Sequence, residues 1–203
     1  MTSVTPRSDS TCPSPILSCP GHTPSPDVKP DTHQKKIMLC VFWDIEGVVH
    51  WKLLDAGTTL TAAMYSQQLE RVAVALRQKR PLKSKVILQM DNARPHVAKL
   101  IRSKIHDLGW EILPRPPYSP DLAPSDYYLF QALNNEIGGQ QFDSDGAHKT
   151  WLTNFFASKP KVFYEFYGIR KLPMKWADWY IIMGLHELEN KDVVSISTNN
   201  FWL

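Results

Sequence analysis

The sequence lacks the features that mark several common classes of protein. It has only three cysteines among 203 residues, Cys12, Cys19 and Cys40, too few for a disulfide framework or a four-cysteine zinc site. No run approaches the roughly 18 consecutive apolar residues of a transmembrane helix, and residues 1–20 do not follow the pattern of a signal peptide. A glycine-rich phosphate loop, a nucleophile elbow and a His-Glu-x-x-His motif are also absent. These absences argue against a secreted or membrane protein and leave carboxylates as the main candidates for chemistry.

Length and composition predict one folded domain between two tails. Residues 1–34 are rich in proline, serine and threonine and show no apolar periodicity, so they cannot bury enough surface to offset the entropy of ordering. Residues 189–203 show no readable period either, and we interpret them as a divergent tail. The domain is therefore expected at 35–188. The net charge of +3 mildly favours a polyanionic partner without identifying one.

The order of local patterns predicts an α/β fold. Two apolar runs, 37–43 and 48–54, flank an Asp-Ile-Glu-Gly turn and predict a β-hairpin. Apolar residues then recur every three or four positions, which predicts an amphipathic helix over 61–78. The elements expected after it are a strand at 86–90, a helix from Pro95 to Gly109, a strand at 110–113, an irregular loop at 114–124, a helix capped by Ser125, and helical stretches at 151–157, 161–167 and 173–183. This order implies a sheet with a parallel portion.

Two carboxylates stand out because rigid elements hold them. Asp91 leaves the carboxyl end of a buried strand, where ligands gather in open α/β sheets. Asp126 lies in the first turn of a helix after the stiff proline loop. Hard divalent cations prefer such oxygen ligands. On spacing alone, however, the commoner interpretation is structural, with Asp91 starting a turn and Asp126 favouring a helix amino end.

The residues around these aspartates resemble the catalytic domain of mariner transposases. The resemblance rests on Asp-Asn-Ala-Arg-Pro-His at 91–96 and Tyr-Ser-Pro-Asp-Leu-Ala-Pro-Ser-Asp-Tyr at 118–127. The 34 residues between Asp91 and Asp126 are the family's spacing between its second and third metal-binding aspartates. Further mariner-like segments lie at 35–44, 53–54, 65–69, 79–81, 163–164 and 168–173. The resemblance covers about residues 20–185.

The resemblance implies an RNase H-like fold and cut-and-paste DNA transposition in the nucleus. In this chemistry two divalent metals, Mg²⁺ or Mn²⁺, activate water or a DNA 3′-hydroxyl to attack a phosphodiester. By position, Asp91 and Asp126 correspond to two of the catalytic metal ligands. Arg94, His96 and Lys99 are expected near the DNA phosphate, although a solvated face is an equally good interpretation of Arg94 and Lys99. The chain departs from the family where Gln-Met precedes Asp91, since a histidine usually stands directly before this aspartate.

Two family features are not found in the sequence. The first catalytic aspartate belongs to a Gly-Asp-Glu-Lys-Trp motif on the strand before the hairpin, and residues 1–19 contain no such motif. Asp44 and Glu46 are not expected to replace it, because strand directions place the hairpin turn at the opposite end of the sheet from Asp91. The paired helix-turn-helix modules that recognise transposon ends are also missing. Any affinity for DNA should therefore be weak, electrostatic and dependent on salt.

Three hypotheses follow for the function. The first, which we favour, is a degenerate mariner catalytic domain, truncated at its amino end and inefficient in transposition. The second is an active nuclease with an unrecognised third ligand, Asp121 or Asp55. The third is a domesticated, noncatalytic fragment that binds DNA or a protein partner. Because the absent first strand is central in the family, we also expect residues 37–43 to pair directly with 86–90 or to remain an exposed edge that promotes self-association.

Overall fold

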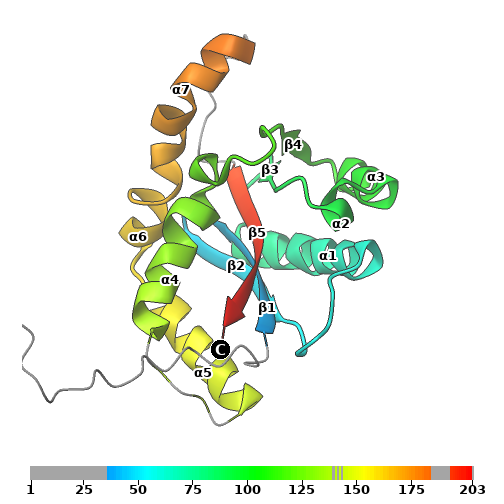
Figure 1. The fold of residues 1–203 in the computed structure, drawn as a ribbon. Coiled ribbons are helices and arrows are strands. Elements are labelled where there is room, and N and C mark those ends of the chain that lie inside the picture. Colours follow the sequence, from blue (N-terminus) through cyan, green and yellow to red (C-terminus); the bar gives the residue numbers. More distant parts are fainter. Residues whose placement is uncertain (1–35, 139, 141, 143, 184–192, 203) are drawn as a thin grey trace, which may run out of the picture. The chain divides into compact units, whose positions relative to one another are not determined.

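A five-stranded mixed sheet in the order β2-β1-β5-β3-β4 forms the centre of the protein (Figure 1). The computed structural model describes residues 36–138, 140, 142, 144–183 and 193–202, all within the unit Gln34–Leu203. The tail predicted for residues 1–34 lies outside the described residues. Within the described ranges, no helix is long and apolar enough to cross a membrane.

The predicted β-hairpin is confirmed. Strand β1 (Lys36–Asp44) pairs antiparallel with β2 (Gly47–Leu53). At the turn, the Asp44 carboxylate accepts a hydrogen bond from the Glu46 amide at 2.9 Å, and Gly47 adopts a φ of 125°, which side chains other than glycine rarely allow. Alternate residues of β1 face two different hydrophobic clusters, so the strand is buried on both faces. This double burial explains its continuous apolar sequence.

Helix α1 (Ala62–Lys79) also agrees with the prediction, within one residue at each end. The Thr61 hydroxyl caps it by accepting from the Met64 amide, and its apolar stripe packs on the sheet. The expected helix from Pro95 to Gly109 is instead two helices, because Ala98 adopts an extended conformation between them. The elements on this side of the molecule are β3 (Ile87–Gln89), α2 (Arg94–Val97), α3 (Lys99–Asp107) and β4 (Glu111–Leu113).

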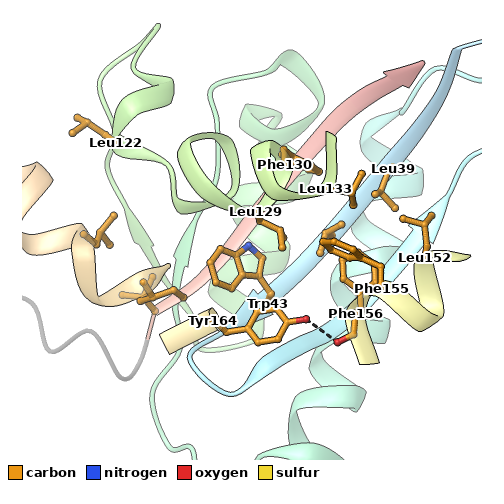
Figure 2. Packing of buried hydrophobic residues seen from close by; sticks show 14 of the residues in the cluster. Leu39, Trp43, Leu122, Leu129, Phe130, Leu133, Leu152, Phe155, Phe156 and Tyr164 are labelled. Carbon is orange, nitrogen blue, oxygen red and sulfur yellow. Dashed lines mark hydrogen bonds between the residues drawn. The ribbon is translucent and has the colours of Figure 1, made fainter. Parts of the chain in front are cut away.

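The other face of the sheet is covered by helices from the second half of the chain (Figure 1). Trp43 is fully buried there and packs against Tyr164 at 5.9 Å between ring centroids. Figure 2 shows this aromatic cluster and the hydrogen bond from the Tyr164 hydroxyl to the Phe156 carbonyl. The elements in this part of the chain are η1 (Pro120–Leu122), η2 (Ser125–Leu129), α4 (Phe130–Ile137), α5 (Asp145–Ser158), α6 (Lys161–Glu165), η3 (Ile169–Lys171) and α7 (Leu172–Met183).

The central position of the sheet is filled by β5 (Val193–Trp202), which lies within the stretch that the sequence suggested was a tail. Strand β5 pairs antiparallel with β1 over residues 36–43 and parallel with β3. The expectation that residues 37–43 would pair with 86–90 or form an exposed edge is therefore wrong. Val193 and Val194 are both fully buried, in the two opposite hydrophobic clusters. After these two adjacent valines the strand continues through mostly polar residues, so its sequence shows no apolar run or alternation of the kind that predicts a strand.

Candidate active site at the carboxyl ends of β3 and β4

The parallel pairing of β3 with β4 brings Asp91 close to Arg115. The last paired residues of the two strands are Gln89 and Leu113. Each of the charged residues follows its strand by two positions, so continuing the register sets them side by side. The side-chain amide of Asn92 donates a hydrogen bond to the Arg115 carbonyl at 3.2 Å and so links the segment after β3 to the segment after β4. The carboxyl end of the parallel pair thus carries one negative and one positive charge.

Asp91 is held by three groups besides the strand itself. Its Oδ1 accepts from the Ala93 amide at 3.1 Å and is hydrogen-bonded to Nδ1 of the buried His96. Burial disfavours the charged carboxylate, but the His96 hydrogen bond and charge, the Ala93 amide and the positive charge of Arg115 outweigh it and lower the pKa of Asp91. The carboxylate is therefore ionised and oriented at neutral pH.

Asp126 reaches the same guanidinium from a different element of the fold. It lies in η2, a π-helical turn that precedes α4, and such turns occur often at functional sites. Its Oδ2 is 3.6 Å from Nη1 of Arg115. Since the charge of Arg115 also acts on Asp91, both aspartates singled out from the sequence lie close to one arginine side chain.

A buried polar network supports the turn that carries Asp126. The Ser125 hydroxyl accepts from the Trp43 indole at 2.9 Å and contacts the Ser195 hydroxyl at 3.0 Å. Ser195 also donates to Gln89 at 3.3 Å, and Gln89 donates to the Leu122 carbonyl at 2.6 Å. The network joins β1, β3, β5 and η2 next to the candidate site. The prediction that Ser125 caps a helix was wrong, because its hydroxyl serves this network instead.

The other residues predicted from the sequence fall into different surroundings. Arg94 and Lys99 are exposed, as a solvated or DNA-facing surface requires. His96 is fully buried, packs against Tyr65 with tilted rings at 4.2 Å between ring centroids, and has no surface to offer a phosphate. Met90, where the family usually has histidine, is buried and accepts a long contact from the Tyr65 hydroxyl at 3.9 Å.

The four remaining acidic candidates do not complete the site. Asp44 is fully buried and paired with Arg80, and Glu46 contacts the same arginine, so both stabilise the hairpin turn. Asp55 and Asp121, considered as a third ligand, are both exposed. Among the described residues there is no group of three or more His, Cys, Asp or Glu side chains that could hold a metal ion.

The residues at this site do not fit a divalent cation. A two-metal site needs several carboxylates, whereas Asp91 and Asp126 are here accompanied by a permanently positive guanidinium. Strand β5, the neighbour of β3, carries no aspartate or glutamate along its ten residues. The arrangement can orient two carboxylates and balance their charge. Among the described residues, no third carboxylate joins them to ligate a metal ion.

Arg115 and Ser195 were missed by reasoning from the sequence. Arg115 follows the strand at 110–113, and the parallel relation of that strand to 86–90 was the signal that would have paired it with Asp91. No local signal identified Ser195, because its partners lie 70 and 106 residues away in the sequence.

Comparisons with known proteins agree with this geometry. Residues 17–86 match the family model described as Transposase (partial DDE domain). The mariner Mos1 transposase of Drosophila mauritiana is 44% identical over 161 residues, which cover 77% of this chain and 46% of that protein. Histone-lysine N-methyltransferase SETMAR of Homo sapiens is 38% identical over 165 residues, which cover 77% of this chain and 23% of that protein.

Solved structures of Mos1 show the same fold. The Mos1 catalytic domain with Raltegravir and Mn has a TM-score of 0.69 at 43% identity, over 76% of this chain and 78% of that chain. The Mos1 paired-end complex with the left transposon end has a TM-score of 0.73 at 43% identity, over 80% of this chain and 48% of that chain.

The sheet, its helices and these matches define an RNase H-like catalytic domain of the DDE transposase class. Within that class, the chain belongs to the mariner family of DNA transposases. It spans about half the length of the Mos1 transposase and 23% of SETMAR.

Proposed function

We propose that this chain is a mariner-type transposase domain that binds DNA and cleaves it poorly or not at all. Relatedness supports the first half, since Mos1 is a transposase and has been solved in a complex with its transposon end. The second half rests on the composition of the site: Arg115 pairs with Asp126 and its charge also acts on Asp91, and the described residues offer no third ligand beside the two aspartates.

The proposed role of divalent metal is correspondingly small. The Mos1 catalytic domain has been solved with Mg and with Mn. Asp91 and Asp126 are the residues of this chain proposed to meet such an ion, but two carboxylates beside a cation should hold it weakly. Arg94 and Lys99 are the proposed contacts to DNA phosphate, and the nucleus is the proposed location.

A second candidate function, noncatalytic binding of DNA, is favoured by one surface. Arg94, Lys99 and Arg102 are all exposed on α2 and α3. Phosphate contacts from such side chains bind DNA without reading its sequence.

Self-association is proposed only through surfaces other than β1, because β5 covers that strand. Light scattering of the purified chain measures its oligomeric state.

A plasmid assay tests the proposal. The purified chain is incubated with supercoiled DNA in Mg²⁺ or Mn²⁺, and binding to a labelled duplex is measured in parallel by fluorescence anisotropy. We expect binding at low salt, with nicking no faster than that of the Asp91→Ala variant. Robust nicking that disappears in Asp91→Ala would show that another residue completes the site. Absence of binding at low salt would overturn both candidate functions.

A further inference from the structure

Arg115 differs from the other basic residues near the candidate site in how deeply it is held. Its side chain is only 8% exposed, whereas Arg94 and Lys99 lie open to solvent. Nη1 lies 3.6 Å from Asp126, and the buried Nε has no hydrogen-bond acceptor among the described residues. A buried donor without an acceptor costs free energy, and the attraction between the guanidinium and the nearby carboxylates offsets part of this cost.

The backbone at Arg115 keeps the side chain in this place. Prolines at 114, 116 and 117 restrict the main chain on both sides of it. The Asn92 amide donates to its carbonyl and thereby ties the loop to the segment that follows Asp91. The guanidinium is therefore fixed beside the two aspartates rather than carried on a freely moving loop.

Two carboxylates on neighbouring elements repel one another unless a positive charge lies close to both. In the metal-dependent chemistry of this class, divalent cations supply that charge. Here a guanidinium is already present, and unlike a metal ion it cannot dissociate or lose its charge at any ordinary pH. Its presence also raises the electrostatic cost of bringing a second cation to the same carboxylates.

We propose that the Arg115 guanidinium takes the place of the divalent cation at Asp91 and Asp126, so that the folded chain balances its site carboxylates without metal. The inference rests on the proposed assignment of these two aspartates as the metal-side carboxylates. If Arg115 takes the place of the cation, removing its charge should increase the affinity of the two aspartates for a metal ion. Removing an ordinary surface ion pair would have no such effect.

The first experiment measures binding of Mn²⁺ to the full chain by titration calorimetry, for wild type, Arg115→Gln and the matched control Arg94→Gln. Each variant loses one positive charge close in sequence to one of the two aspartate motifs, but only Arg115 pairs with Asp126, whereas Arg94 is exposed. We expect Arg115→Gln to bind Mn²⁺ at least about tenfold more tightly than wild type. Arg94→Gln should match wild type. An equal gain in both variants, or no gain in Arg115→Gln, would overturn the inference.

A double-mutant cycle keeps the inference testable if Arg115→Gln is unstable. Thermal melts in EDTA are recorded for Arg115→Gln, Asp126→Asn and the double variant. If the arginine balances the carboxylates, Arg115→Gln should lower the melting temperature by several degrees in the wild-type background and by less in Asp126→Asn. Mn²⁺ should raise the melting temperature of Arg115→Gln alone. Equal losses in both backgrounds would mean that Arg115 acts only through packing.

These readouts are independent of DNA. If Arg115→Gln gains Mn²⁺ affinity while wild type fails to bind DNA, the proposed function fails and the inference stands. If wild type binds DNA but Arg115→Gln gains no metal affinity, the inference fails and the proposed function stands.

Discussion

The orientation of the Asp91 carboxylate is fixed by neighbouring groups of the chain itself. Its oxygen receives the Ala93 amide and the His96 ring, and His96 in turn is buried against Tyr65. A buried side chain with few rotamers orients a carboxylate more strictly than a solvated one. His96 therefore acts as a positioning residue for Asp91, and the motif that joins them within 91–96 is a structural unit as well as a sequence signature.

The lowered pKa of Asp91 predicts a dependence of stability on pH. The ordinary value is 3.8. Because the folded state lowers the pKa, the ionised carboxylate stabilises the fold above about pH 4, and this contribution is lost as the pH falls through the folded-state pKa. In EDTA, the free energy of unfolding of wild type should exceed that of Asp91→Asn at pH 7, and the difference should shrink towards pH 3.

Urea unfolding followed by circular dichroism at several pH values measures this difference. The matched control is Asp55→Asn, which removes the same charge at an exposed position. A wild-type advantage over Asp91→Asn that stays constant between pH 7 and pH 3 would contradict the prediction.

Strand β5 is the element on which the sheet depends. It is the only connection between the hairpin strands and the parallel pair in the order β2-β1-β5-β3-β4 of the described residues. Ser195 adds a buried side-chain link from this strand to β3 and η2. The last ten described residues of the chain thus join segments that would otherwise expose two rows of unpaired backbone groups.

Removal of β5 should therefore abolish cooperative folding. A chain that ends at residue 192 leaves buried amides and carbonyls on β1 and β3 unpaired, at a cost of about 1–3 kcal/mol each, against a total stability of about 5–15 kcal/mol. We expect this truncated chain to aggregate or to melt without a transition. Addition of a peptide with the sequence of residues 193–202 should restore a cooperative melt, whereas a scrambled peptide should not.

Differential scanning calorimetry of the truncated chain tests whether it unfolds cooperatively without β5. A truncated chain that melts cooperatively at the wild-type temperature would mean that β5 contributes nothing to the sheet. The full chain should not respond to the added peptide, because its own strand fills the place.

At the scale of the whole molecule, charge rather than shape sets the expected interaction with DNA. The net charge is only +3, but the acidic residues near the site are paired internally while Arg94, Lys99 and Arg102 face solvent. A local basic surface can attract a polyanion even when the overall charge is small.

The affinity for duplex DNA should fall steeply with salt and depend little on sequence. Each phosphate contact contributes about 0.9 to the slope of log affinity against log salt. We expect Arg94→Ala and Lys99→Ala each to reduce affinity several-fold and to lower this slope by about one. Arg170→Ala is the matched control, since that arginine is exposed but pairs with Glu165. Anisotropy titrations at several salt concentrations with two unrelated duplexes would contradict the prediction if the slopes of all variants agree.

Local pattern alone determined much of this protein. The apolar runs around Asp44, the three- and four-residue spacing in α1 and the buried strand before Asp91 each carry their signal within a few residues, so the hairpin, the helix and the position of the carboxylate could be predicted. The motifs at 91–96 and 118–127 were sufficient to indicate the mariner family, which the comparisons show.

Only the tertiary structure decided how distant segments complete one another. Strand β5 has its partners more than 100 residues away, and its sequence after Val194 is mostly polar, so no local pattern predicts it. Arg115 comes near enough for its charge to act on Asp91 only through the parallel register of two short strands, and it pairs with Asp126 only through the turn that follows the proline loop. Pairings of this kind depend on which backbone groups and charges remain unsatisfied elsewhere in the fold, and that is a property of the assembled sheet rather than of any segment.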